Sequence, residues 1–500
     1  MPDSKEKTVN LSEPLDYEAL PEFAEEIKKE LQKSIIAQDR AIEEVVNKFI
    51  TSIFADPEKP KGIFFLAGPT GVGKTELVKI FAKHIFGDKN ALTRVDCNKL
   101  KHEHSDQSLI GSPPGYVGFQ ERNRLFDQRQ IDKWGFFKKI AGDFKNDPAK
   151  KQKFIDKFSG RLKEEIRQLI KSAAEEDHVI KNFEANKAYF MLRNKINEEQ
   201  ADQYINNLKS QLAAAQNELK KKQKMLADFE NNADALLYTI KAYYENLLKK
   251  ISILRESKTQ NQGLAETEEK LENLEKELNY IPGAYESILL FDEFEKAHPV
   301  VYDLVLSIID EARLTLSDNS IVKFNNTYVF FTSNIGSEQI KKILTGAVLG
   351  FTTGTSSDSI DRQIYESTLH EIDKFFLNRT EILGRIGKEN ITVFRPLNEA
   401  ELKMILEKCT IPNFQQFIKN KYNINLVVEE SFKERIIKES SDKFNRPLGA
   451  RPLLRITKNR LQEPLCILLL KGAIKDGDTV VVSWKKEEKK GKFVFRKILV

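Results

Sequence analysis

Short apolar runs alternate with longer helical periodicities over most of the chain. The clearest run is Gly62–Ala67, which is followed by a further glycine and is typical of a buried strand. Similar runs predict four further strands, over Leu92–Cys97, Ser287–Asp292, Thr327–Thr332 and Asn390–Phe394. Because these runs are almost continuously apolar and helical segments separate them, we expect a parallel five-stranded sheet covered on both faces. The predicted fold class is therefore α/β.

Residues 120–285 interrupt this alternation. A heptad pattern from Ile205 to Leu254 predicts one long helix of a coiled coil, although two lysines of one seam, Lys222 and Lys250, weaken its packing locally. A second helix over residues 264–281 is expected to return antiparallel to the first. This insertion can be a spacer or a dimerising arm, or it can engage a substrate or an adaptor.

The same patterns divide the chain into five parts. In order, we expect a flexible tail over 1–20, the first part of the sheet domain over 21–119, the helical coiled-coil insertion over 120–285, the second part of the sheet domain over 286–397, and a C-terminal small helical domain with terminal strands over 398–500.

Composition excludes several classes of protein. The net charge of +5 on 500 residues is too small to indicate nucleic-acid binding. The three cysteines are widely spaced and match no zinc or disulfide pattern, which favours a reducing compartment. No apolar run approaches the roughly 20 residues needed to span a bilayer. We therefore expect a cytoplasmic protein that binds neither a membrane nor nucleic acid.

The loop after the first strand carries candidate chemistry. It consists of Gly68, Pro69, Thr70, Gly71, Val72, Gly73, Lys74 and Thr75. Its glycines let backbone N–H groups turn toward phosphate oxygens, and the helix that follows begins with favourable potential for an anion. Lys74 is expected to reach the β- and γ-phosphates, and the hydroxyl of Thr75 to bind Mg²⁺. The predicted cofactors are ATP and Mg²⁺.

The run Ser287–Glu293 supplies the second half of such a site. Asp292 ends the apolar strand and is expected beside the metal, and Glu293 is expected to polarise the attacking water as a general base. Alone, an apolar run that ends in two acids is an ordinary strand end. Its combination with the phosphate-binding loop favours a nucleotide site.

Five further segments resemble the Clp/ClpB family of AAA+ unfoldases, specifically their second ATPase module. The resemblance covers the family's pore loop, Walker B extension, sensor 1, arginine-finger segment and sensor 2, in that order, at Leu109–Gly118, Phe291–Pro299, Thr332–Asn334, Arg379–Ile386 and Gly449–Leu453. It implies a P-loop NTPase that forms a hexameric ring and uses ATP to pull protein substrates through a central pore.

The resemblance also implies roles for three polar residues. Asn334 would hydrogen-bond the attacking water or the γ-phosphate. Arg385 would reach the γ-phosphate of the neighbouring subunit, and Arg451 would report the nucleotide state from the small domain of the same subunit. Because the site would be completed by a second subunit, activity should require a ring.

Apolar and aromatic positions receive roles in the same way. Ile35 and Ile36 resemble the segment that packs on adenine, where Ala37 replaces the usual glycine. Tyr116 and Val117, in the pore-loop segment, would press on the substrate without reading its sequence.

Two features leave the partners open. The place of the insertion, just after the pore-loop segment, resembles that of the intermediate domain of HslU, and this analogy of architecture leads us to expect an adaptor or substrate role there. The segment that contains Leu349, Gly350 and Phe351 resembles the tripeptide with which some Clp proteins dock on a ClpP-like peptidase, although a packed turn would look alike. The protein is therefore expected either to feed a peptidase or to act alone as a disaggregase.

Three other functions remain as alternatives. A dedicated remodeller of a secretion or defence assembly would share the same motifs. A DNA-associated ATPase of the SMC type would need a Leu-Ser-Gly-Gly signature, which the sequence lacks. A scaffold with an inert site is disfavoured because Lys74, Asp292, Glu293 and Arg385 are all present.

Overall fold

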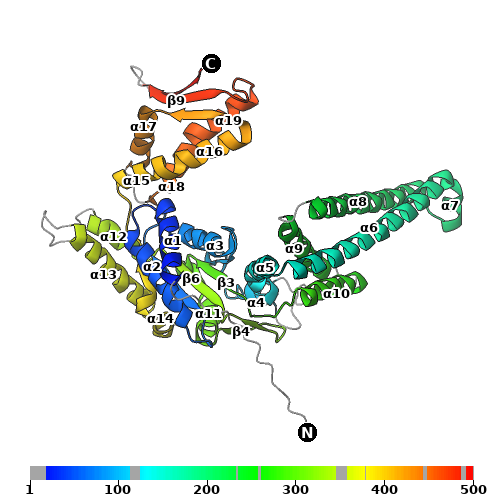
Figure 1. Cartoon of the computed structure of the whole chain (residues 1–500), viewed down its shortest axis with the longest axis horizontal. Helices are drawn as coiled ribbons and strands as arrows, with labels where there is room; N and C mark the ends of the chain where they lie inside the picture. Colours follow the sequence, from blue (N-terminus) through cyan, green and yellow to red (C-terminus); the bar gives the residue numbers. More distant parts are fainter. Residues whose placement is uncertain are drawn as a thin grey trace, which may run out of the picture. The chain divides into compact units, whose positions relative to one another are not determined.

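The structure is a computed structural model and describes residues 19–112, 124–231, 235–256, 261–344, 357–377, 379–442, 448–485 and 491–498. The chain forms two compact units. Of the described residues, the first unit holds those up to 134 and from 282 onward, and the second holds 135–281 (Figure 1). Within the described residues, no helix is both long and apolar enough to cross a membrane.

The first unit is built on a parallel five-stranded sheet, as the sequence predicts. Its strand order is β2-β3-β6-β1-β7, with bounds Thr93–Asp96, Ser287–Asp292, Thr327–Ser333, Gly62–Ala67 and Ile391–Val393. The register pairs Ala67 with Ser333 and with Val393, and Asp96 with Asp292. The carboxyl ends of the strands therefore meet along one edge, where ligands of open α/β sheets bind.

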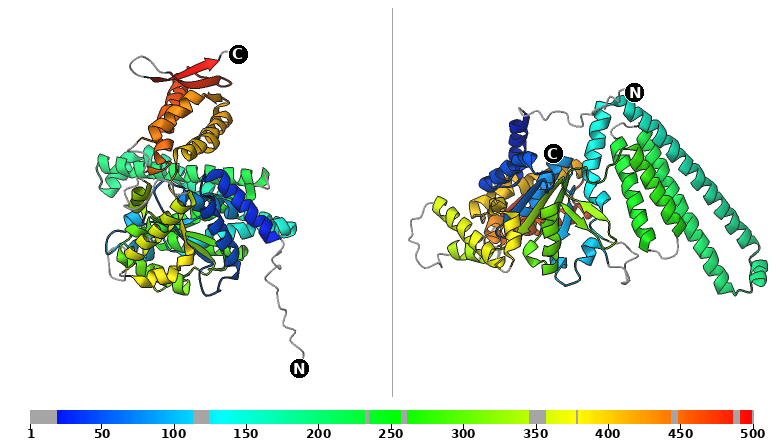
Figure 2. Two further views of the ribbon diagram at one scale, coloured as in Figure 1. Left: turned by 90° about the vertical axis from the view of Figure 1, so that its left-hand side faces the viewer. Right: turned by 90° about the horizontal axis from the view of Figure 1, so that it is seen from below.

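Helices cover both faces of this sheet because successive strand residues point to opposite sides. Phe64 and Leu66 face a core that includes α1 (Ala19–Ser34), α2 (Asp39–Thr51) and α3 (Lys74–Phe86). Phe65 and Ala67 face a core formed with three helices on the other side (Figure 2). These helices are α11 (Pro299–Glu311), α13 (Ser357–Phe375) and α14 (Thr380–Ile386).

Shorter elements complete the large part of the first unit. They are η1 (Ser52–Phe54), η2 (Cys97–Lys99), α4 (Gln107–Ile110), η4 (Phe294–Lys296), the antiparallel pair β4 (Arg313–Thr315) and β5 (Ile321–Lys323), α12 (Ser337–Leu344) and η5 (Lys388–Asn390).

The C-terminal part is a small helical subdomain with strands. Its helices are α15 (Glu399–Ile405), η6 (Leu406–Thr410), α16 (Ile411–Tyr422), α17 (Glu430–Ser440), α18 (Arg451–Thr457), η8 (Lys458–Gln462) and α19 (Glu463–Leu470). The two predicted terminal strands are present as β9 (Thr479–Lys485) and β10 (Lys492–Ile498), which pair antiparallel. A third strand, β8 (Asn425–Val428), pairs parallel with β9 and was not predicted.

The second unit, which we call the arm, is helical. Its elements are α5 (Gln128–Asn146, from residue 135 onward), α6 (Pro148–Ala185), α7 (Lys187–Asn194), α8 (Glu198–Asn231), α9 (Ala235–Glu256) and α10 (Asn261–Glu277). The prediction of one continuous helix from Ile205 to Leu254 is wrong. Helix α8 ends at Asn231 and packs along α6, whereas α9 packs along α10 (Figure 1). The heptad pattern continues through both helices, but the partner helix is α6 for the first and α10 for the second.

One of the two lysines in the predicted seam, Lys222, has a partner that the pattern did not show. Lys222 of α8 forms an ion pair with Glu165 of α6 at 2.5 Å. The hydroxyl of Tyr243, on α9, donates to the other oxygen of Glu165 at 2.7 Å. Although burial opposes ionisation, the hydrogen bond from Lys222 and that from Tyr243 keep the pKa of Glu165 below its usual value. One carboxylate therefore links three helices of the arm, and Lys222 is not simply a defect in its packing.

Candidate nucleotide-binding site

A cavity of about 1080 Å³ lies at the carboxyl edge of the sheet in the first unit. The phosphate-binding loop, the beginning of α3 and the ends of β3 and β6 line one side. The other side comes from the segment around Ile35, from η6 of the small subdomain and from the residues that begin α18. Both parts of the first unit therefore contribute to one cavity.

Glycines are required for the shape of the phosphate-binding loop. Gly68, Gly71 and Gly73 have φ values of 135°, 73° and 108°, which other residues rarely adopt. A Cβ on Gly68 would lie 2.4 Å from the carbonyl oxygen of Phe394, and one on Gly71 would lie 2.3 Å from that of Leu448. The loop can take this course only without side chains at these positions.

Lys74 is buried at the beginning of α3. Its Nζ donates to the carbonyl oxygens of Gly68 at 2.7 Å and Pro69 at 2.6 Å, and to Oδ1 of Asn334 at 3.1 Å. Burial lowers the pKa of Lys74 to about 7. An anionic group in the loop would favour the charged ammonium again, so this side chain is suited to a phosphate ligand.

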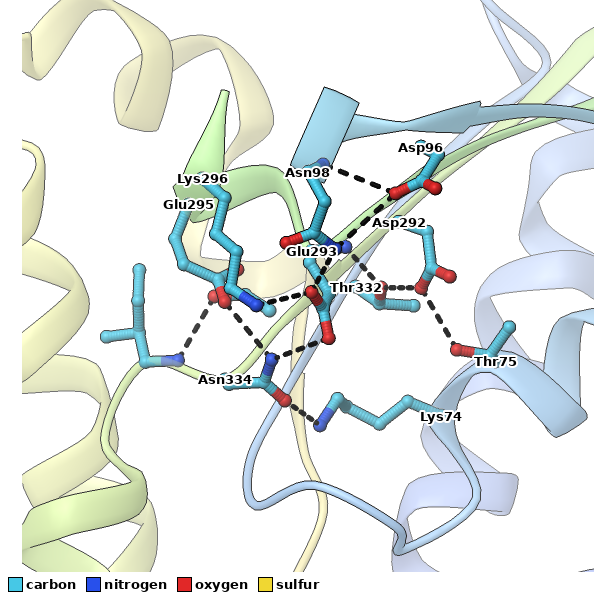
Figure 3. A network of polar contacts seen from close by, with 12 residues as sticks. Lys74, Thr75, Asp96, Asn98, Asp292, Glu293, Glu295, Lys296, Thr332 and Asn334 are labelled. Carbon is cyan, nitrogen blue, oxygen red and sulfur yellow. Dashed lines mark hydrogen bonds and ion pairs between the residues drawn. The ribbon is translucent and has the colours of Figure 1, made fainter. Parts of the chain in front are cut away.

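Asp292 accepts hydrogen bonds on both carboxylate oxygens. Its Oδ1 accepts from the hydroxyls of Thr75 at 3.0 Å and Thr332 at 2.5 Å, and its Oδ2 pairs with Arg94 of β2. Figure 3 shows Thr75, Thr332 and Asp292 together. Sequence reasoning missed Arg94, and it gave Thr332 only as the first residue of the sensor 1 segment, without this contact; the register of neighbouring parallel strands brings both residues here.

Glu293 lies next to Asp292 with a φ of 57°, an uncommon value for a residue with a side chain. Its Oε2 accepts from Nδ2 of Asn98 and from Nζ of Lys296, and the amide of Asn334 lies 3.5 Å from Oε1 (Figure 3). Burial opposes ionisation of Glu293, but the hydrogen bonds from Lys296 and Asn98 outweigh it and hold its pKa below the usual value. Glu293 is therefore an ionised carboxylate whose position is fixed by hydrogen bonds from Asn98 and Lys296.

Asn334 joins the two halves of the site. Its Oδ1 accepts from Lys74, and its Nδ2 donates to Oε1 of Glu295 at 3.1 Å. Glu295 was not singled out from the sequence as a site residue. The phosphate-binding loop and the acidic segment after β3 are thus connected through one amide side chain at the end of β6.

The apolar end of the cavity contains Ile35 and Ile36, both nearly fully buried. Ala37 follows them with a φ of 63°, in the left-handed region that favours glycine. The side chain of Gln38 then forms two hydrogen bonds with the backbone of Arg395, at 2.9 and 3.1 Å. The chain reversal at Ala37 is therefore fixed by a contact with the segment that leads into the small subdomain.

The small subdomain contacts the phosphate-binding loop directly. The N–H of Ala450 donates to the carbonyl oxygen of Gly71 at 2.9 Å. Gly449 has a φ of 60°, and a Cβ there would lie 2.7 Å from the carbonyl oxygens of Thr70 and Gly71. Arg451 lines the cavity immediately after this contact.

Arg385 does not join these residues. It lies on α14, its side chain is half exposed, and it forms an ion pair with Asp310 of α11. It is absent from the described residues that line the cavity. The predicted pore-loop residues Tyr116 and Val117, and the predicted docking residues Leu349, Gly350 and Phe351, lie outside the described residues.

The donor atoms fit a magnesium nucleotide. Thr75 and Asp292 offer a hydroxyl and a carboxylate to a hard cation, and both lie next to Lys74 and the glycine loop. The described residues contain no group of three His, Cys, Asp or Glu side chains that could hold a metal alone. A cation here would therefore depend on oxygens of the nucleotide and of water.

Comparison with known protein families agrees with this geometry. The family described as "AAA domain (Cdc48 subfamily)" matches residues 59–134 and 207–388, more than half of the chain. The chain belongs to this AAA domain family. Residues 397–482 match the "C-terminal, D2-small domain, of ClpB protein". The first match covers four of the five sheet strands, all but β7, with the phosphate-binding loop and the acidic segment, and the second covers most of the small subdomain of this AAA protein.

Similar proteins include Clp chaperones and an ATP-binding subunit. The chaperone protein ClpB of Aquifex aeolicus (strain VF5) is 26% identical over 94% of this chain and 30% of its own length. The chloroplastic chaperone protein ClpC2 of Oryza sativa subsp. japonica is 26% identical over 93% and 33%. The ATP-dependent Clp protease ATP-binding subunit ClpA homolog of Porphyra purpurea is 26% identical over 91% and 36%. The AAA chain spans about one third of the length of these relatives.

Proposed function

We propose that this protein hydrolyses ATP and uses the energy to unfold and move protein substrates. One observation carries the ATPase proposal: Lys74, Thr75, Asp292, Glu293 and Asn334 come from three separated segments and meet at one cavity. Membership of the AAA domain family supports it. The similarity to Clp chaperones supports the choice of protein as substrate.

Each residue has a task that follows from its chemistry. The loop from Gly68 to Thr75 binds the phosphates through backbone N–H groups, and Lys74 neutralises them. Bound Mg²⁺ would be held by Thr75 and Asp292 and would supply charge neutralisation. Glu293 accepts a proton from the attacking water, and Asn334 positions that water or the γ-phosphate. At the other end of the cavity, Ile35 and Ile36 exclude water around the base.

We further propose that the site is completed by a neighbouring subunit of a hexameric ring. Arg385 is outside the cavity of its own chain and half exposed, as an arginine that acts on a neighbour must be. In phosphoryl transfer such an arginine can contribute about 10³–10⁵ in rate. Arg451 lines the nucleotide cavity of the same chain and transmits the nucleotide state to the small subdomain.

The work on the substrate is assigned to the segment with Tyr116 and Val117, which would line a central pore. The five-part division of the chain and a cytoplasmic location belong to the same proposal. The proposal can include two partners. A ClpP-like peptidase would dock at Leu349, Gly350 and Phe351, and an adaptor would bind the arm. Without a peptidase, the same machine would act as a disaggregase or as a remodeller of one assembly.

The test separates hydrolysis from threading. Glu293→Gln should bind ATP but release phosphate at least about 10²-fold more slowly, because the general base is lost. Tyr116→Ala should retain phosphate release but lose unfolding of a fluorescent protein substrate. If Glu293→Gln hydrolysed ATP at the normal rate, the assigned chemistry would be wrong; if Tyr116→Ala unfolded the substrate normally, the pore assignment would be wrong.

A further inference from the structure

The arm contains a small cavity of about 250 Å³ that the proposed ATPase site does not use. Its apolar floor is formed by Ile140 and Phe144 of α5, Phe154 of α6 and Leu278, just after α10. The rings of Phe144 and Phe154 pack with their centroids 5.5 Å apart. These four side chains belong to one compact unit, so the floor does not depend on how the two units are placed.

Three lysines of α6 stand at the rim of this cavity, which we call the arm pocket. Lys150, Lys153 and Lys157 lie three and four residues apart and therefore share one face of the helix. Lys150 forms an ion pair with Asp143 at 2.8 Å, and Lys157 forms one with Glu277 at 3.0 Å. Among the described residues, Lys153 makes no ion pair.

The charges around the arm pocket do not cancel. Glu277 also pairs with Arg161, so two cations share that one carboxylate. With Lys150 matched by Asp143, the excess positive charge lies at Lys153 and near Lys157. A ligand that covers the apolar floor must therefore present a negative group at the rim.

The size of the cavity restricts the ligand further. A volume of about 250 Å³ accommodates one large side chain and is too small for a helix face. Apolar floor and basic rim lie within one pocket, so a single residue has to supply both an apolar side chain and a carboxylate. The last residue of a polypeptide meets this requirement, because its side chain and its free carboxylate are attached to the same Cα atom. A free amino acid would also bring its ammonium group to the positive rim, which is unfavourable.

We propose that the arm pocket binds the C-terminal residue of a protein partner. A leucine, methionine or phenylalanine side chain lies on Phe144 and Phe154, and the terminal carboxylate pairs with Lys153. Calling that partner a client rests on the proposed function, whereas binding itself needs no nucleotide. The arm thereby selects polypeptides by a free apolar C-terminus.

Fluorescence anisotropy of the full chain without nucleotide tests this site. The probe is a short labelled peptide that ends in leucine with a free carboxylate. We expect its affinity to fall about tenfold or more when the peptide is amidated, because a charge-assisted hydrogen bond is lost. A peptide that ends in serine, and one with an internal Leu-Glu pair and an amidated end, should also bind about tenfold or more weakly.

Substitutions locate the interaction. Lys153→Ala changes an exposed side chain and should lower the affinity for the peptide with a free carboxylate about tenfold. Lys151→Ala, on the same helix but outside the pocket, is the matched control and should bind normally. Equal binding of the amidated peptide, or unchanged binding by Lys153→Ala, overturns the proposal. Phosphate release is measured in parallel. If the unsubstituted protein releases no phosphate from ATP, the ATPase proposal is wrong, but the result on peptide binding still holds.

Discussion

The side-chain amide of Asn98 donates a hydrogen bond to Oε2 of Glu293. Asn98 lies in η2, directly after β2, and Glu293 directly follows β3, which pairs with β2 in parallel. The same oxygen also accepts from Lys296. One oxygen of the carboxylate that we propose as the general base is therefore engaged by two donors of its own chain, and these donors hold the side chain in place and reduce its basicity.

We expect Asn98→Ala to increase basal ATP hydrolysis by up to roughly tenfold, because a hydrogen bond to a charged group is worth about 1.5 kcal/mol. Since the bond from Asn98 also helps to lower the pKa of Glu293, its removal should raise that pKa. The acid limb of the kcat profile should then move to higher pH, as Glu293 must be ionised to act.

Steady-state phosphate release over a pH series measures both effects. Lys99→Ala, which changes a neighbouring and largely exposed side chain, is the control and should behave normally. A fall of Asn98→Ala to the level of Glu293→Gln would show that Asn98 assists Glu293 instead of holding it back.

Nucleotide binding should take up a proton above neutral pH. In the ligand-free site, burial lowers the pKa of Lys74 to about 7, so at pH 8.5 this amine is mostly neutral. Phosphate oxygens favour the ammonium, so binding must protonate it. The affinity should therefore decrease above pH 7 by up to about tenfold per pH unit, and be independent of this group below about pH 6.

Calorimetry with ADP, in two buffers that differ in ionisation enthalpy, measures this uptake directly. Thr75→Ala serves as the control, because it alters the hydroxyl next to Lys74 but keeps the amine, and it should still take up a proton. Identical heats in the two buffers at pH 8.5 would contradict the assignment of Lys74.

Replacing Ala37 by glycine should stabilise the large part of the first unit by roughly 0.5–1 kcal/mol. A left-handed conformation costs a residue with a Cβ about 1–2 kcal/mol, and glycine loses part of this gain through its greater freedom in the unfolded chain. Urea unfolding should show a higher midpoint for Ala37→Gly and a lower one for Ala37→Val. The reverse order would mean that the turn is not strained.

Local patterns were sufficient to predict the sheet and the phosphate-binding loop. Four of the five strands lie in short apolar runs, whereas β2 has only Val95 as a buried apolar residue, and the loop from Gly68 to Thr75 is contiguous. Arg94 and Asn98 could not be found in this way, because nothing in their local sequence marks them, and Thr332 was identified only as part of the sensor 1 segment, without its bond to Asp292. They meet the acidic segment only through the register of neighbouring strands.

The arm shows a second limit of sequence patterns. The heptads before and after Asn231 are continuous, so they predicted one helix, but periodicity does not tell which helix will be the partner. The pairing of Lys222 with Glu165 arises because residues far apart in the chain are brought together on α6 and α8. In the same way, Arg385 is predicted from its motif, whereas the task that we propose for it would depend on a second chain.

The sharing of the site between subunits is the central claim and can be tested by mixing two inactive variants. Glu293→Gln lacks the base but keeps Arg385, and Arg385→Ala lacks the arginine but keeps the base. Each variant alone should bind ATP and release almost no phosphate. After they are mixed and allowed to exchange subunits, some sites combine an intact Glu293 with an intact neighbouring Arg385, and phosphate release should return. If the mixture is no more active than the two variants measured separately, the site is not completed by a neighbouring subunit.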